Sequence, residues 1–148
     1  MEENLKQLLL KDLCARLPYG VKGQAKGMIK FFGDEEVSDE PWTLTDINVQ
    51  LNRFGADSQI NIPLYNRMGE CNFKPYLFPM SSMTEEQYNE IWNCMTTDNR
   101  ETLKRAQSGQ MAANPYCNVM DFYNKNHFDY RGLIEKGLAL DATGLNIY

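Results

Sequence analysis

The residues that could do chemistry gather in the stretch Asn126–Arg131, which contains the chain's single histidine. His127 could act as a general base or as a metal ligand. Asp129 could orient the imidazole, and Arg131 could hold an anion. A structural interpretation is also open: His127 ends one helix, Asp129 caps the next helix, and Arg131 lies on its surface. An enzyme that uses His127 and Asp129 is therefore one hypothesis.

Other catalytic and metal-binding patterns do not occur in the sequence. The four cysteines are dispersed at positions 14, 71, 94 and 117 with no C-x-x-C pair, so they give no zinc-ligand spacing with the single histidine. No G-x-S-x-G elbow, EF-hand loop or phosphate-binding loop is present. We therefore expect no metal and no cofactor, and we favour a non-enzymatic role.

Lysines could form a binding face. Lys22, Lys26 and Lys30 share one side of a predicted strand, which could hold a nucleotide, RNA or an acidic partner, or could simply be solvated. Aromatic side chains could add a stacking pocket or belong to the core; they are Tyr76, Phe78, Phe122, Tyr123, Phe128 and Tyr130. The binding set that we predict comprises Lys22, Lys26, Tyr76, His127, Asp129 and Arg131.

The charge balance limits the partner. The net charge is −5 and the isoelectric point is about 4.9, whereas nucleic-acid binders usually carry a basic excess that neutralises phosphates. Nucleic acid is therefore not the expected partner, and a protein partner is favoured. No apolar run reaches the ~18 residues of a membrane span, and the N-terminus does not have the pattern of a secretion signal. Free thiols suit a reducing compartment, so we expect a cytoplasmic protein without a membrane partner.

Hydrophobic periodicity predicts the elements that must position these residues. Leucines at helical spacing predict a helix over residues 4–17, which Pro18 ends. Alternating apolar and polar residues predict strands over residues 19–32, 42–52 and 60–64, with a bulge near residues 45–46 and Pro63 at an edge. Residues 53–57 read as a turn and residues 66–82 as an extended connector. Short connections favour an antiparallel meander.

The C-terminal half is predicted to be helical. A capping box formed by Thr84 with Gln87, or by Ser82 with Glu85, indicates a helix start. The buried face of this helix would be formed by Tyr88, Ile91, Trp92 and Met95. Further helices are expected over residues 98–107 and 117–126, followed by turns that end at a left-handed Gly137 and by an apolar tail that docks on the domain.

The predicted fold is thus a single α+β domain spanning residues 1–148. It has an N-terminal helix, a three-stranded antiparallel meander and a helical C-terminal half.

Parts of the chain resemble a family of small proteins carried by gut anaerobes, their phages and their mobile elements. The similar strings are KDLCARLPYGVK at residues 11–22, KPYLFPMSSMTEE at residues 74–86 and NKNHFDYRGLIEKGL at residues 124–138. The resemblance implies an accessory role and assigns no catalytic residue. Our leading hypothesis is a non-enzymatic binding module that contacts a host or phage protein. The alternatives are a binder or sponge of a nucleotide-like molecule and the enzyme that uses His127 and Asp129.

Overall fold

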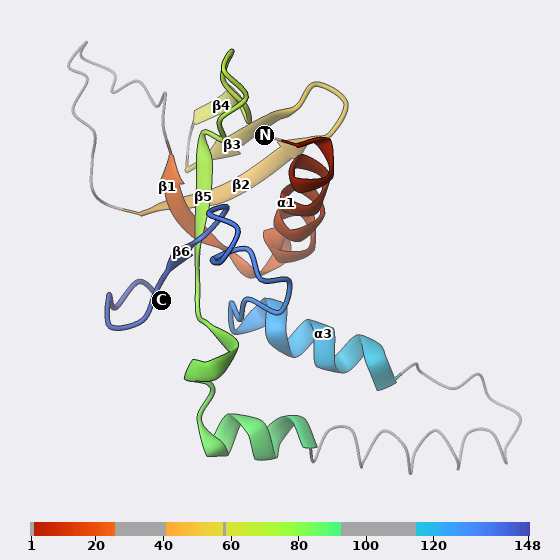
Figure 1. Cartoon of the computed structure of the whole chain (residues 1–148), viewed down its shortest axis with the longest axis vertical. Coiled ribbons are helices and arrows are strands. Elements are labelled where there is room, and N and C mark those ends of the chain that lie inside the picture. Colours follow the sequence, from red (N-terminus) through yellow and green to blue (C-terminus); the bar gives the residue numbers. More distant parts are fainter. Residues whose placement is uncertain (1, 26–40, 58, 93–114) are drawn as a thin grey trace, which may run out of the picture.

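The computed structural model describes residues 2–25, 41–57, 59–92 and 115–148. Within these ranges, six strands form one mixed sheet, and an N-terminal helix packs against it, which confirms the α+β prediction (Figure 1). Helix α1 spans Glu3–Arg16 and is followed by the 3-10 turn η1, Leu17–Tyr19, which contains Pro18. The predicted end of the helix before this proline is therefore confirmed.

The sheet has the strand order β4-β3-β2-β1-β5-β6. Its strands are β1 Lys22–Ala25, β2 Trp42–Asn48, β3 Arg53–Ala56, β4 Gln59–Pro63, β5 Phe73–Leu77 and β6 Leu140–Asp141. Neighbouring strands from β4 to β5 pair antiparallel, whereas β6 pairs with β5 in parallel. The structure therefore does not confirm a three-stranded meander.

Three strands were missed because their signals are weak in isolation. Strand β3 has only four residues and lies in the stretch that we predicted to be a turn. Strand β5 lies in the predicted connector and contains Pro75. The outer neighbour of β5 is β6, which has only two residues, so β5 lies close to the edge of the sheet, where the missing N–H of a proline is tolerated. Strand β6 belongs to the tail, which does dock on the domain. The predicted bulge is confirmed by a register shift between Leu44 and Asp46, and Pro63 does end the edge strand β4.

The sheet also curls so that its distant members meet. Tyr65, just after β4, forms an antiparallel bridge with Cys71, just before β5. The N–H of Asn72 donates to the carbonyl of Leu64 at 2.7 Å. Strands β4 and β5 are separated in the sheet by β3, β2 and β1, so contacts between their ends require the sheet to curl around one apolar interior.

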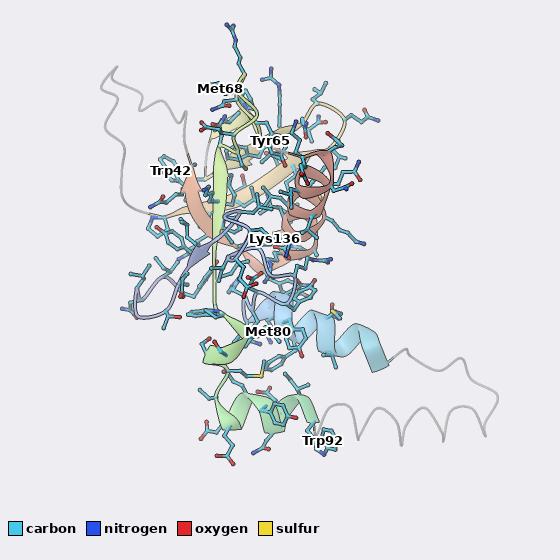
Figure 2. All side chains as sticks on the ribbon, viewed as in Figure 1. Trp42, Tyr65, Met68, Met80, Trp92 and Lys136 are labelled. Carbon is cyan, nitrogen blue, oxygen red and sulfur yellow. The ribbon has the colours of Figure 1, made fainter. Side chains whose placement is uncertain are left out.

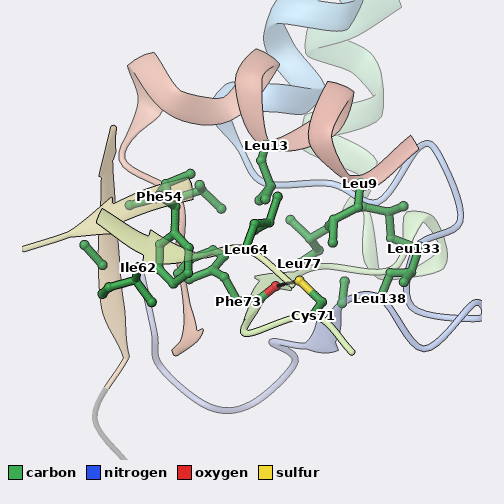
Figure 3. Packing of buried hydrophobic residues seen from close by; sticks show 14 residues of the cluster. Leu9, Leu13, Phe54, Ile62, Leu64, Cys71, Phe73, Leu77, Leu133 and Leu138 are labelled. Atoms are coloured by element: carbon green, nitrogen blue, oxygen red, sulfur yellow. Dashed lines mark hydrogen bonds between the residues drawn. The ribbon is translucent and has the colours of Figure 1, made fainter. Parts of the chain in front are cut away.

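The core lies between α1 and the inner face of this curled sheet (Figure 3). Leu9 and Leu13 of α1 are fully buried against Phe54 and Phe73, whose rings are 5.3 Å apart. Strands β1 and β5 approach closely at Gly23: a Cβ there would lie 2.6 Å from the ring of Phe73, so no larger residue fits without displacement.

Helices and turns follow β5. The 3-10 turn η2, Met80–Ser82, leads into a helical stretch over residues 85–92, and α3 spans Pro115–Lys125. The capping box of Thr84 and Gln87 is confirmed by reciprocal bonds of 2.9 and 3.2 Å. The described residues do not include the predicted helix over residues 98–107. They also do not include Lys26 or Lys30. With β5 and β6 in it, the C-terminal half is not simply helical.

Among the described residues, no helix combines the length and the apolar character that a membrane crossing requires.

Candidate functional site

Two segments far apart in the sequence, residues 11–22 and residues 124–138, meet around one buried carboxylate. Asp12, on α1, accepts two hydrogen bonds from Arg16, at 2.7 and 3.1 Å, and one from Nε of Arg131 at 3.1 Å. The side chains of Asp12 and Arg16 are fully buried, and that of Arg131 is 19% exposed. One carboxylate therefore faces two guanidinium groups, which leaves the cluster with a net positive charge.

Other donors of the two arginines are engaged as well. Arg16 donates to the carbonyl of Phe128 at 2.6 Å and to that of Tyr123 at 3.5 Å, which ties α1 to the end of α3. The ring of Tyr130 lies 5.4 Å from the guanidinium carbon of Arg16 and 4.8 Å from that of Arg131. Its hydroxyl accepts a bond of 2.9 Å from Arg131. Arg131, which we expected to hold an external anion, thus holds Asp12.

Asp129 organises a turn. Its carboxylate oxygens accept hydrogen bonds from the backbone N–H groups of Leu133 and Ile134, at 2.7 and 2.9 Å. Residues 130–137 form turns, as predicted, so Asp129 caps a turn and not the helix of the structural interpretation. Gly137 closes this region with a φ of +69°, in the left-handed conformation that we predicted. Both Asp129 oxygens are therefore committed to local structure.

His127 is buried just beyond the end of α3 and has a φ of +61°. Burial, together with the nearby charges of Arg16 and Lys22, lowers the pKa of its imidazole to about 4. The ring is therefore neutral at pH 7 and is a weak base. Its Nδ1 atom is buried and has no hydrogen-bond partner among the described residues. The two rings of His127 and Tyr148 stack at 3.7 Å between centroids, with 10° between their planes.

Tyr148 is 41% exposed, but its hydroxyl end enters a slot between β1 and β5 that the sequence did not predict. Its hydroxyl accepts the N–H of Lys22 at 2.9 Å and lies 2.8 Å from the carbonyl of Tyr76 and 3.3 Å from that of Lys22. The Nζ of Lys22 donates to the carbonyl of Ile147 at 3.2 Å. Burial raises the pKa of the Tyr148 phenol to about 12, so it stays protonated. The structure therefore places the imidazole of His127 on the ring of Tyr148 and backbone groups of Lys22 and Tyr76 at its hydroxyl.

A separate groove lies between η2, the helical residues 85–92 and α3. It has a volume of about 420 Å³ and is lined by Met80, Met83, Thr84, Glu85, Tyr88, Ile91 and Tyr123. Figure 2 shows Met80 between the two helices and Trp92 at the far end of residues 85–92. Of the face predicted to be buried, Ile91 is buried, but Tyr88 and Trp92 are exposed, and Met95 lies outside the described residues.

Within the described ranges, no group of three or more His, Cys, Asp or Glu side chains is placed to hold a metal ion. Comparisons of the chain with protein-family models, with curated proteins and with solved structures find no match. The function must therefore be argued from the buried cluster, the slot and the groove themselves.

Proposed function

We propose that the protein is a non-enzymatic binding module that takes a host or phage protein into the groove beside residues 85–92. The observation that carries this proposal is the exposure of large apolar side chains at the groove. Tyr88 is 62% exposed and Met80 is 37% exposed, although both line a concave surface. Contiguous apolar surface of this kind is typical of an interaction site.

The chemistry of the groove suits a protein side chain as its occupant. Met80 and Met83 have flexible, polarisable thioethers that adapt to the shape of a partner. Tyr88 and Tyr123 offer rigid rings with a polar end, which contribute contact area at a low cost in conformational entropy. A groove between two helices is the usual receptor for an amphipathic helix.

The charges around the groove select the partner further. Glu85 lines the groove, and Glu86 and Glu90 are exposed on the same helical stretch. No lysine or arginine is among the residues that line it in the described structure. A partner helix that places basic residues beside its apolar anchors would therefore complement the site, and we commit to a basic amphipathic helix as the occupant.

The state of the predicted catalytic residues supports a non-enzymatic role. The imidazole of His127 is buried and stacked, and the carboxylate of Asp129 is bonded to two backbone amides. Neither group faces the groove. A general base needs access to the proton that it removes, which this arrangement does not give.

The first test is a pull-down from host lysate with micromolar bait, comparing the wild type with Tyr88→Ser. Leu51→Ser is the matched control, because Leu51 is also 62% exposed but lies in the turn after β2. We expect a partner that is lost with Tyr88→Ser and retained with Leu51→Ser. Recovery of no partner, or equal recovery with both variants, would contradict the proposal.

The second test examines the class of occupant. A fluorescently labelled, designed Leu/Lys amphipathic peptide is titrated with the protein, and its Leu/Glu counterpart serves as the control. We expect binding of the basic peptide, weakening as ionic strength rises because exposed charges are screened. Glu90→Lys should weaken it further. Equal binding of both peptides would show that the groove recognises apolar surface alone and would exclude the basic partner.

A further inference from the structure

The Tyr148 slot lies where two strands of the sheet separate, and it is independent of the groove. Gly23 of β1 stands opposite Pro75 of β5, so the next facing pair is Lys22 and Tyr76. At this pair the hydroxyl of Tyr148 is inserted between the strands and bridges the backbone groups of both. A side chain thus occupies a place that a direct ladder bond would otherwise fill.

The slot offers more hydrogen-bonding capacity than a phenol can use. It presents one donor, the N–H of Lys22, and two acceptors, the carbonyls of Lys22 and Tyr76. A hydroxyl has one hydrogen, so it can donate to only one of the two carbonyls. The shorter distance, 2.8 Å, assigns that bond to Tyr76, and the carbonyl of Lys22 is left with the longer contact of 3.3 Å.

A different planar group would match these atoms better. A ring nitrogen beside an exocyclic amino group accepts one hydrogen bond and offers two hydrogens next to it. The ring nitrogen would take the N–H of Lys22, and the amino group would supply both carbonyls. The imidazole of His127 provides the stacking platform, because it is buried, neutral and already parallel to the ring of Tyr148.

We propose that this slot is a binding site for an amino-substituted nucleobase of the adenine type, and that Tyr148 is its built-in competitor. The phosphate of a nucleotide would be recognised by Lys22. Its ammonium is held by the carbonyl of Ile147, so displacement of residues 147 and 148 frees the base slot and the cation in one step.

This arrangement predicts a specific order of affinities. A tethered Tyr148 competes with the ligand at a high effective concentration, so the wild type should bind adenosine monophosphate more weakly than variants with a weakened competitor. Tyr148→Ala should bind adenosine monophosphate at least about tenfold more tightly than the wild type. The affinity of Tyr148→Phe should lie between those of the wild type and the alanine variant, because phenylalanine keeps the stack on His127 and loses the hydroxyl bonds to the two strands. Uridine monophosphate, which has a carbonyl in place of the amino group, should not bind.

The experiment is isothermal titration calorimetry of the three full-length proteins with adenosine and uridine monophosphates, after circular dichroism has shown each to be folded. Lys22→Met, which leaves the backbone groups in place, should weaken the monophosphate at least about fivefold relative to adenosine, because only the monophosphate uses the ammonium. Adenosine itself should bind no more weakly than to the wild type, because the variant also loses the bond that holds Ile147 over the slot. Equal affinity for the two nucleotides, or a Tyr148→Phe variant no tighter than the wild type, would overturn the proposal.

The proposal can be tested even if Tyr148→Ala does not fold. If Tyr148→Ala does not fold, the wild type is titrated with millimolar adenosine monophosphate while the amide resonances of Lys22 and Tyr76 are followed by NMR. Shifts at both amides, absent with uridine monophosphate, support the slot. Unchanged resonances at millimolar ligand overturn it.

Discussion

The buried carboxylate of Asp12 gives the sharpest prediction about stability. Replacing Asp12→Asn keeps the size of the side chain and removes its charge. The fully buried guanidinium of Arg16 then has no counter-ion, and an amide group faces donors where an anion accepted three bonds. The substitution therefore tests whether the cluster holds α1 to the C-terminal half.

The magnitude follows from the burial of the cluster. Breaking a buried ion pair by removing one partner costs about 3–5 kcal/mol, because the other charge stays in a medium that solvates it poorly. A domain of 148 residues loses about 3 °C of melting temperature per kcal/mol, so the expected drop is about 10–15 °C. That is a large share of a total stability of about 5–15 kcal/mol.

The assay is urea unfolding followed by far-ultraviolet circular dichroism, with a thermal melt in parallel. Lys11→Ala is the control, since Lys11 is the exposed neighbour of Asp12 on α1 and should change stability by less than about 0.5 kcal/mol. Arg131→Met should cost less than Asp12→Asn, because the side chain of Arg131 is partly exposed and Arg16 still neutralises Asp12.

Two results would refute this reasoning. One is an Asp12→Asn protein within about 1 kcal/mol of the wild type, which would mean that the arginines do not need the carboxylate. The other is a destabilisation that disappears at high ionic strength, which would mean that the cluster is open to solvent and screened.

Three further predictions concern local features. The pKa of His127 is about 4 in the folded protein against an ordinary 6.5, so the unfolded chain binds a proton that the folded protein excludes. The free energy of unfolding should therefore fall as the pH drops from 6.5 toward 4. His127→Asn, which tolerates the positive φ, should flatten that part of a plot of the urea midpoint against pH. Gly23→Ala should cost about 2–4 kcal/mol in urea unfolding, because its Cβ would lie 2.6 Å from the ring of Phe73 and against the backbone carbonyl of Lys74, neither of which can move freely. Thr84→Ala should cost about 1 kcal/mol, or about 3 °C in a thermal melt, because it removes one half of the capping box.

The parts of the fold that were predicted correctly are those with local signals in the sequence. The leucines of α1 repeat at helical spacing and Pro18 stops the helix, so the helix and its C-terminal end follow from neighbouring residues. The capping box of Thr84 and Gln87 is equally local, with bonds between residues three positions apart. Each of these features is decided by contacts within a few positions along the chain, which is why the sequence alone specifies them.

The remaining strands depend on distant partners. Strand β5 becomes a strand because β1 lies beside it, and its proline and short length conceal this in the sequence. Strand β6 has two residues and exists because Tyr76 and Leu77 offer it a free edge. Tyr88 and Trp92 were expected inside because they are large and apolar, but they are exposed on the helical stretch beside the groove. Periodicity identifies an apolar face and does not show whether another part of the chain covers it.

The candidate site was predicted by residue type more than by geometry. Lys22, Tyr76 and His127 were chosen from separate stretches for their side chains. They lie next to Tyr148, which stands 126 positions from Lys22, but Tyr76 contributes only its backbone carbonyl there. No local pattern marks that tyrosine. Arg131 was chosen for its ability to hold an anion, and the anion is the side chain of Asp12, 119 positions away.

The segments at residues 11–22, 74–86 and 124–138 form one connected structural unit, which links a buried frame to the proposed binding surface. The segments at residues 11–22 and 124–138 meet through Asp12 and Arg131, and the segment at residues 74–86 joins them through Phe78, whose N–H and carbonyl bond to His127 and Asp129 at 2.8 Å each. This third segment then continues directly into η2 and the groove. A buried, charge-paired frame therefore fixes the start of the groove, and a groove that is ordered before binding loses less entropy when a partner docks. Disturbing the cluster should accordingly weaken the groove as well as the fold.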